Sequence, residues 1–572
     1  MGAVGVTILC LIGFFLAYHL YAKHLARNVF QLRPDRTTPA HELRDGIDYV
    51  PANRYVLFGH HFASVAGLSP MLGPAIAVIW GWLPGLLWVF FGGILIGAVH
   101  DFGALVISIR ARGLSVGKVA EAIIGRRAKT MFHILIFFLI SFAMGVFILV
   151  ISGLFSRTHP EAVLPTFSLM ILAVGVGYLS YRRRFRLGPL TAGAFALSLL
   201  IVAVGLRLPV TGISAGSWNL ILLVYCFLAS VLPVWQLLQP RDYINSFLLY
   251  LGLAAMYAGF FLMGPEFQAP AIQPSPAGAP PIFPFVFIVI ACGAISGFHG
   301  LVASGTTAKQ LDRETDATFI GYGGMIGESL LGLIAVLACT AGFASPGAWA
   351  EHYRDWEIAG NLTEKLGAFI DGAGLFIHQL GVSLPLAKGF VAFIAVSFAL
   401  TSLDSATRLL RFNITEMSET LRLPVLGNRF VASLLAVAVI GFFAYYRIDG
   451  EPAGMVLWEL FGTTNQVLGC LVLLAITVYL IQRKRPSLYT LLPMLFMFLT
   501  TITAMILKIR DFHRDGHLLL LIIGCGILIL TLWLAGEAAF RLARLYREGF
   551  PSIDLDIRIE PGAKRPPDPS RG

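Results

Sequence analysis

The chain has 572 residues, of which 57% are apolar and 13% are charged. Soluble proteins carry roughly 25% charged residues, so this composition excludes a soluble globular protein and predicts an integral membrane protein. The formal net charge is +10. Its basic residues are dispersed over many loops beside apolar segments, which argues against a nucleic-acid-binding protein.

Apolar runs of about twenty residues recur along the chain, the length that an α-helix needs to cross roughly 30 Å of hydrocarbon. They lack the alternation of an outer-membrane β-barrel. We therefore expect an all-α, polytopic integral membrane protein embedded in the lipid bilayer. It should have about fifteen transmembrane helices, centred near residues 12, 69, 95, 141, 171, 197, 228, 253, 293, 331, 397, 438, 468, 498 and 529.

Lysine and arginine favour cytoplasmic loops, and this bias predicts the orientation of the chain. With the N-terminus outside, the inside loops hold 33 of the 42 lysines and arginines. These loops are 23–54, 110–129, 181–187, 239–243, 305–320, 408–429, 482–487 and 541–572. The prediction is therefore an outside N-terminus and a cytoplasmic C-terminus.

Two segments interrupt their apolar spans in a matching way: FGHHFASVAGLSPMLGP (58–74) and GAISGFHGLVASGTTAKQ (293–310). Gly59, Gly67 and Ser69 stand at the same offsets from His61 as Gly297, Gly305 and Thr307 do from His299. In the predicted topology these two spans run in opposite directions. Paired antiparallel broken helices are typical of inverted-repeat secondary transporters, whose site lies where the helices are unwound. Close helix packing is the alternative explanation for such small residues.

The breaks are expected near 67–74, at Gly67, Ser69, Pro70, Gly73 and Pro74, and near 300–307, at Gly300, Ser304, Gly305, Thr306 and Thr307. The resulting division of the chain is 1–56 for the first span and loop, 57–207 for the first repeat and 208–282 for connecting spans. Then come 283–481 for the second inverted repeat, 482–545 for peripheral spans and 546–572 for a proline-rich, flexible cytoplasmic tail.

Histidines and acids inside apolar spans are costly and often mark proton or substrate routes. His60, His61 and His299 could carry a proton or bind substrate, or could instead donate to a helix carbonyl and stay neutral. Metal binding is not expected, because adjacent histidines project about 100° apart on a helix and no HExxH motif occurs. The candidate carboxylates are Asp101, Glu328, Asp404 and Glu459, each of which could also be a structural partner of an arginine or histidine. Thr401 and Ser402 could surround a small cation or bond their own helix.

Six blocks in order, FGHHFASVAGLSPMLGPAIAVIWGWLPGLLW, GAVHDF, QPRDY, CGAISGFHGLVASGTTAKQL, LTSLDSATR and LWELFGTTNQVLG, resemble the carbon starvation protein A family of bacterial inner-membrane transporters. The resemblance implies uptake of peptides or pyruvate during nutrient limitation, driven by proton symport, within the amino acid, polyamine and organocation superfamily. In that superfamily the helix carrying Thr401 and Ser402 often helps to frame a cation. Local departures, including QPRDY, leave the substrate open.

The predicted function is secondary active import of a small nutrient across the bacterial inner membrane. A sodium-coupled transporter and a channel are the alternatives. No cofactor, metal or catalytic residue is expected, because GxSG, GxGD and HExxH motifs are absent from the sequence. The oligomeric state stays open. The expected ion-coupling residues are His60, Asp101, Glu328, Thr401, Ser402 and Asp404. The expected substrate-binding residues are His61, Gly67, Ser69, Gly73, His299, Ser304, Gly305, Thr306, Thr307 and Asn465.

Overall fold

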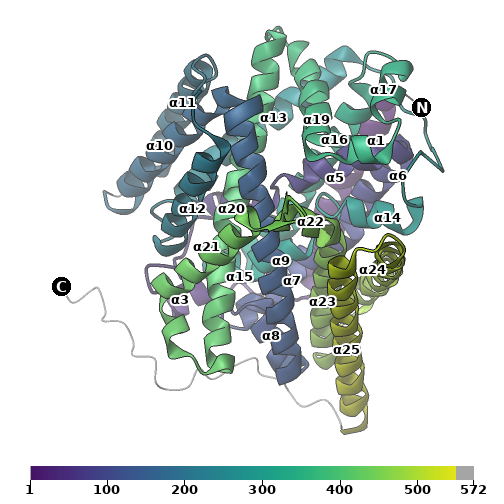
Figure 1. The fold of residues 1–572 in the computed structure, drawn as a ribbon. Coiled ribbons are helices and arrows are strands. Elements are labelled where there is room, and N and C mark those ends of the chain that lie inside the picture. The colour runs from purple at the N-terminus through teal and green to yellow at the C-terminus, as the bar shows by residue number, and fades with distance from the viewer. Residues whose placement is uncertain (1, 184, 549–572) are drawn as a thin grey trace.

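The structure is a computed structural model that describes residues 2–183 and 185–548 (Figure 1). Nearly every element in this part of the chain is helical, which confirms the predicted all-α class. The only strands in the described ranges, β1 (Arg447–Ile448) and β2 (Glu451–Pro452), form one antiparallel hairpin. The predicted flexible tail falls outside the described residues from 549 onward.

Among the described residues, eleven helical stretches are long and apolar enough to cross a membrane. They are Ala3–Val29, Trp82–Arg110, Arg126–Thr158, Pro160–Tyr181, Leu187–Gly205, Leu238–Met263, Glu314–Ala341, Leu384–Leu421, Ala453–Gln482, Leu488–Arg514 and Leu518–Arg544. Their α-helices are α1 (Ala3–Leu16), α2 (Ala22–His24), α6 (Trp82–Leu87), α7 (Ala98–Arg110), α9 (Arg126–Gly153), α10 (Val163–Tyr181), α11 (Leu187–Gly205), α13 (Leu238–Met263), α16 (Gly323–Ala341), α20 (Leu384–Leu421), α22 (Ala453–Leu457), α23 (Phe461–Gln482), α24 (Leu488–Arg514) and α25 (Leu518–Glu548).

Shorter helices complete the set of apolar segments. Two pairs are interrupted: α4 (Arg54–Val65) with α5 (Ser69–Ala77), and α14 (Ile282–Val289) with α15 (Gly297–Gly305). Two more, α12 (Ala215–Val231) and α21 (Arg429–Tyr445), are single apolar helices. Together with the eleven long stretches, these elements stand at all of the predicted span centres. The remaining helices are α3 (Pro39–Glu42), α8 (Val116–Ile123), α17 (Pro346–His352), α18 (Trp356–Gly360) and α19 (Leu362–His378).

Burial separates a central set of helices from a peripheral set. The most apolar window of Ala453–Gln482 is 94% buried and that of Glu314–Ala341 is 89% buried, against 17% for α11 and 28% for the span that contains α25. In Figure 1, α10 and α11 lie at one side of the molecule and α24 and α25 at the other. The N-terminus lies at the same end as α17 and α19. The core is therefore built around α16 and α23, with the least buried helices turned toward lipid.

The first broken helix is interrupted where the sequence indicates. α4 ends at Val65 and α5 begins at Ser69, with a bend of 44° between them. Pro70 stands in the first turn of α5. Proline has no backbone N–H, so it cannot continue a preceding helix but fits the start of a new one.

The second broken helix is interrupted earlier than expected. Gly300, Ser304 and Gly305 lie inside α15, and the unwound backbone is residues 290–296. The predicted position of this break, near 300–307, is therefore wrong; that region is the C-terminal end of α15. Gly293 supplies the reason, since its φ of +90° is accessible to glycine but strained for other residues.

The two broken helices cross in opposite directions, as predicted. α4 packs against α15 and α5 packs against α14, so the first half of each broken helix meets the second half of the other. The crossing is tight: a Cβ on Gly73 would lie 2.7 Å from the Val289 carbonyl oxygen. His61 precedes its break and His299 follows its own. The equal sequence offsets around the two histidines are therefore not the symmetry of the fold. The predicted repeat and domain boundaries stay predictions.

Candidate functional site

A chain of buried ionisable side chains lies directly behind the second unwound segment. His299 Nδ1 is 3.0 Å from Asp101 Oδ2, and His299 Nε2 is 3.2 Å from Glu328 Oε2. The other Asp101 oxygen accepts a hydrogen bond from His100 Nδ1 at 2.7 Å. All four side chains are fully buried. We call His100, Asp101, His299 and Glu328 the buried relay.

The relay draws on three membrane elements. Asp101 comes from α7 and Glu328 from α16, the helices that follow the two broken ones, and both carboxylates converge on His299 of α15. Within the described ranges, neither carboxylate is ion-paired with a lysine or arginine. A buried charge is costly unless it is compensated, so the charge of this cluster must be adjusted by protons on its own members. The arrangement can therefore take up and release a proton.

Cys292 extends this cluster toward the break. One ligand atom each of Cys292, His299 and Glu328 lies within 4.8 Å of the others, a geometry that could hold a metal ion. In that case Asp101 would orient the histidine from its other ring nitrogen. The sequence did not indicate this grouping, because a single cysteine in an apolar span is usually a packing residue. The expectation that the chain binds no metal stays a prediction.

His61 connects the two broken helices. Its Nδ1 forms a hydrogen bond of 2.9 Å with Thr307 Oγ1, just beyond the end of α15, and the ring packs against Gly324 of α16. Its Nε2 is buried and has no hydrogen-bond partner in the structure. Two predicted substrate-binding residues, His61 and Thr307, are thus in direct contact. They lie on the α4 and α15 side of the crossing, away from the central cavity described below.

His60 and Asp404 belong to a second cluster, centred on a buried arginine. His60 Nδ1 donates to Asp242 at 2.6 Å, and Arg241 donates to both Asp242 and Asp404. Tyr225 also donates to Asp404, at 2.5 Å. We call these five residues the anchor cluster. It joins α4, α12, α13 and α20 through a network of one guanidinium, two carboxylates, an imidazole and a phenol hydroxyl.

The anchor cluster also corrects the predicted topology. Residues 239–243 were expected in an inside loop, but α13 begins at Leu238, and Arg241 and Asp242 are buried within it. An arginine seemed too costly for a span because one of its two carboxylate partners, Asp404, is remote in sequence. Arg241 and Asp242 were missed as site residues; the adjacent opposite charges in QPRDY were the available signal.

Hydroxyl groups line the side of the first break. Ser402 Oγ donates to the Ser64 carbonyl at 3.1 Å, and the Ser64 and Ser405 hydroxyls are 2.8 Å apart. Thr401 donates to the Ser397 carbonyl of its own helix at 2.9 Å. Ser402 is therefore at the break, while the Thr401 hydroxyl is used within α20; their role in ion coupling stays a prediction. Ser64 and Ser405 were not singled out from the sequence.

A small cavity of about 30 Å³ lies where the two breaks meet, and we call it the central cavity. This volume is room for a water molecule or two. Predicted residues Gly67, Ser69 and Ser402 line it, together with Cys292, Phe298 and Phe461, which the sequence reasoning missed. The remaining walls are apolar residues, many of them from α9. The cavity is thus mostly apolar, with its hydroxyl groups on one side.

The N-termini of α5 and α15, which both lie at the crossing, differ in whether a side chain caps them. Asn465 Oδ1 accepts from the Phe298 N–H at 3.0 Å, and Asn465 Nδ2 donates to Ser296 at 3.0 Å, so a protein side chain already caps α15. The segment at Gly305–Thr307 is the C-terminal end of that helix and offers no helix N-terminus. No side chain caps α5, which begins at Ser69 on the central cavity. The α5 N-terminus is therefore the one open toward the cavity.

A second cavity, of about 950 Å³, reaches from the break to the surface. We call it the vestibule. Ser69 and Phe461 line both this cavity and the central cavity, so they form the partition between the two. Gly73, a predicted site residue, also faces it. Its outer walls include Trp356 of α18, Lys365 of α19 and Lys508 of α24, so it opens at the end of the molecule where α17 and α19 lie.

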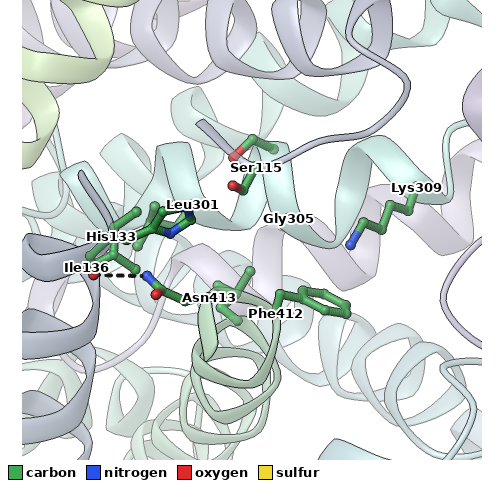
Figure 2. A pocket seen from close by; sticks show the side chains of 10 residues that line it. Ser115, His133, Ile136, Leu301, Gly305, Lys309, Phe412 and Asn413 are labelled. Atoms are coloured by element: carbon green, nitrogen blue, oxygen red, sulfur yellow. Dashed lines mark hydrogen bonds between the residues drawn. The ribbon is translucent and has the colours of Figure 1, made fainter. Parts of the chain in front are cut away.

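The molecule is closed at the end opposite the vestibule. Figure 2 shows the small cavity of about 20 Å³ at the C-terminal end of α15, lined by Gly305, Lys309 and Phe412 among others. Lys309 Nζ sits 3.4 Å from the centre of the Phe412 ring. Ser304 and Thr306 bond carbonyls of their own helix at 2.7 and 3.2 Å. Four predicted residues near 304–307 thus lie toward this closed end rather than on the central cavity.

The packing at Gly67 gives a direct test of the break. A Cβ at Gly67 would lie 2.5 Å from Ser402 Oγ. We expect Gly67→Ala to destabilise the protein by about 1–3 kcal/mol, because the new methyl group displaces Ser402 Oγ from the Ser64 carbonyl or forces the packed helices apart. Thermal unfolding in detergent measures the loss. Gly153→Ala is the matched control, since a Cβ there meets nothing within 4 Å. Adding Ser402→Ala to Gly67→Ala should recover stability; equal stability of the two single alanine variants would contradict the geometry.

Acid should weaken the closed end through Asp48, which lies in the loop before α4. Its carboxylate accepts from Arg408 at 2.7 Å and from Arg411 at 2.8 Å. Burial raises the pKa of Asp48, but Arg411, Arg408 and Lys309 outweigh it and lower this pKa from 3.8 to about 2. A carboxyl group whose pKa is lower in the folded than in the unfolded protein stabilises the folded state. For Asp48 this contribution to the free energy of unfolding is about 2 kcal/mol; it is complete above pH 4 and is lost as the pH falls toward 2. The stability gap between wild type and Asp48→Asn should therefore narrow over this interval; a constant gap would contradict the assignment.

Sequence comparison places these features in a known family. The family described as Carbon starvation protein CstA matches residues 2–378 and 357–504. The chain is 32% identical over 580 residues to the peptide transporter CstA of Campylobacter jejuni, covering 91% of this chain and 82% of that protein. It is 30% identical to the peptide transporter CstA of Bacillus subtilis, covering 98% of this chain and 100% of that protein. It is 32% identical to the pyruvate/proton symporter BtsT of Escherichia coli, covering 89% and 82%.

Two solved structures also align with much of the chain. A manganese transporter of Eremococcus coleocola aligns with a TM-score of 0.48 and 15% identity, covering 88% of this chain and 99% of that one. MhsT in complex with L-phenylalanine aligns with a TM-score of 0.47 and 12% identity, covering 85% of this chain and 99% of that one. Both scores are below 0.5. The sequence relatives confirm the predictions of a transporter rather than an enzyme and of a multi-pass bacterial membrane protein: the chain belongs to the carbon starvation protein CstA family.

Proposed function

We propose that this chain is a proton-coupled symporter that imports a small carboxylate-bearing nutrient, either a peptide or pyruvate. One observation carries the proposal: buried His299 bridges Asp101 and Glu328 next to the unwound backbone of the second broken helix. The names of the relatives, which are peptide transporters and a pyruvate/proton symporter, supply the substrate classes.

The buried relay supports proton coupling through its charge. It contains two carboxylates, and no lysine or arginine in the described chain is ion-paired with them. An anion that enters the adjacent central cavity adds negative charge to a site already rich in it. Proton uptake by the relay offsets that charge, so anion binding and protonation favour each other. Import then follows when the loaded site is exposed to the other side.

The vestibule supplies the route for the anion, and Lys365 is the group on it that a carboxylate would meet; the basic Lys508 and Arg514 and the acidic Glu357, Glu459, Asp511 and Asp515 also line it. Burial, followed by the nearby Lys508 ammonium, lowers the pKa of Lys365 to about 8, so Lys365 is mostly charged at neutral pH. No ion pair to Lys365 is found among the described residues, and a substrate carboxylate would compensate it. From there the anion moves inward past Phe461 to the N-terminus of α5, which no side chain caps and whose positive dipole end favours a carboxylate.

The central cavity is too small for such a substrate in this conformation. With room for a water molecule or two, it must widen by movement of Phe461 or of the half-helices around it. The vestibule is open and the Lys309–Phe412 end is closed. We interpret the structure as an outward-facing conformation, which requires that α17–α19 lie outside the cell.

This orientation is part of the proposal: bacterial inner membrane, N-terminus outside and C-terminus cytoplasmic. The bias of lysine and arginine toward the opposite end of the molecule supports it. A role during carbon starvation is also part of the proposal, and the family to which the chain belongs supports it. A deletion strain should then grow poorly when peptides or pyruvate are the sole carbon source.

Uptake by purified protein in proteoliposomes tests the function. The panel contains pyruvate, a dipeptide and a tripeptide, each measured with an inward proton gradient, an inward sodium gradient or neither. We expect concentrative, saturable uptake of one substrate class with the proton gradient alone. Uptake that follows the sodium gradient and ignores pH would replace proton by sodium coupling. Flux that never exceeds equilibrium under any gradient would indicate a channel and overturn the proposal.

A further inference from the structure

Five arginines line one pocket at the closed end of the molecule. The pocket has a volume of about 180 Å³ and is bordered by Arg33, Arg36, Arg110, Arg483 and Arg485, with Tyr479 at its side. We call it the arginine pocket. It lies apart from the relay, the central cavity and the vestibule, and shares no lining residue with those two cavities.

The positive charge of the arginine pocket is only partly compensated. Glu314 accepts from Arg36 at 2.9 Å and from Arg110 at 2.8 Å. Arg110 also donates to the Tyr479 hydroxyl at 3.1 Å, which fixes its orientation. Arg33, Arg483 and Arg485 form no ion pair with any residue that the structure describes. Three neighbouring guanidinium groups without an acidic partner repel one another, and a bound anion would relieve that repulsion.

The depth of the arginine pocket is set by the ends of three membrane-crossing segments. The first span ends at Val29, α7 ends at Arg110 and α23 ends at Gln482, each next to or within the pocket lining. Helices that cross the hydrocarbon end at its boundary. The pocket therefore lies at the level of the lipid headgroups, where phosphate groups are concentrated.

Apolar helix surface continues from the pocket toward the middle of the membrane. The first span and α24 are neighbours, because His24 forms a hydrogen bond of 2.9 Å with the Tyr489 hydroxyl. Both expose leucines along their length: Leu16 and Leu20 on the first span, and Leu488 and Leu492 on α24, are 46% to 66% exposed. This surface suits acyl chains. A free phosphate ion has no apolar part that would contact this surface.

We propose that the arginine pocket binds the phosphate headgroup of an anionic phospholipid, whose acyl chains lie along α1 and α24. The guanidinium fork matches phosphate oxygens in pairs, and basic pockets between transmembrane helices bind such headgroups. Glu314 holds two of the arginines in place. Arg33, Arg483 and Arg485 provide the uncompensated charge that selects an anionic lipid over a zwitterionic one.

Lipid retention by the purified full chain tests this site. Protein in detergent is titrated with phosphatidylglycerol, phosphatidylcholine or inorganic phosphate, and bound lipid is counted by native mass spectrometry alongside the thermal midpoint. The test variant is R33Q/R483Q/R485Q, whose side chains are exposed and unpaired within the described chain. The matched control is R182Q/R183Q/R186Q, which removes the same charge from three exposed arginines in the 181–187 loop.

Wild type and control should bind phosphatidylglycerol at least about tenfold more tightly than the test variant, with little binding of phosphatidylcholine. Equal phosphatidylglycerol binding by the test and control variants would overturn the site. Equal binding of the two lipids by wild type would overturn anion selection. Inorganic phosphate that matches the stabilisation by phosphatidylglycerol would keep the phosphate site but overturn the lipid as its ligand. If the triple variant fails to fold, single glutamine substitutions replace it. They are judged by the same ratio of phosphatidylglycerol affinities between control and variant.

Discussion

Glu328→Gln is expected to abolish accumulation of substrate under an inward proton gradient while leaving substrate exchange intact. Glu328 is fully buried and lies 3.2 Å from His299 Nε2. The amide keeps the size of the side chain but cannot release a proton, so the relay loses one of the groups that change charge during the cycle. Gradient-driven uptake and counterflow exchange in proteoliposomes separate the two activities. Asp101→Asn should behave in the same way.

The control for this change is Glu266→Gln, the same substitution at an exposed position in the loop after α13. It should accumulate substrate like the wild type. His299→Ala should also abolish accumulation, because it disconnects Asp101 from Glu328. If Glu328→Gln still concentrates substrate under a proton gradient, the relay does not carry the coupled proton.

Arg241→Met is expected to cost about 3–5 kcal/mol of folding free energy. Its guanidinium compensates Asp242 and Asp404, and all three side chains are buried. Removing one partner of a buried ion network leaves uncompensated charge, which is far more costly than never having had the network. Expression level and the thermal midpoint in detergent measure the effect.

Arg241→Met with Asp404→Asn supplies the matched comparison. The double variant leaves no unpaired charge at Asp404, while Asp242 keeps its hydrogen bond from His60. It should therefore recover part of the lost stability. Wild-type stability of Arg241→Met alone would show that the anchor cluster is not what joins α4, α12, α13 and α20.

Hydropathy alone predicts most of the fold. Every predicted span centre falls within an apolar helix or at one of the two breaks, because each membrane-crossing helix must satisfy its backbone internally and cover itself with apolar side chains. The first break was also predictable, since Pro70 and the nearby glycines are local causes. These are properties of a segment by itself, and a single sequence records them.

The second break was misplaced because its causes are a single glycine and a contact between helices. Residues 290–296 contain no proline, and the opening depends on Gly293 and on the close crossing of α5. Asp101, His299 and Glu328 were recognised individually as buried ionisable groups. Their convergence on one imidazole depends on three helices remote in sequence, and no local pattern reports it.

Asp404 and His60 depend on tertiary packing in the same way. Both were predicted as ion-coupling groups from their place in apolar spans, and whether either takes part in coupling stays a prediction. In the structure each is hydrogen-bonded within the anchor cluster around Arg241. Burial of an acid identifies a group that needs compensation; whether an arginine or a movable proton supplies it depends on the tertiary packing.

Proton movement itself can be followed in proteoliposomes that contain a pH-sensitive dye and have no imposed gradient. Adding the transported substrate outside should acidify the lumen in wild-type vesicles, with a rate that saturates in step with uptake. Glu328→Gln vesicles should show exchange of substrate without acidification. Substrate uptake by the wild type with no change in lumenal pH would contradict proton symport through the buried relay.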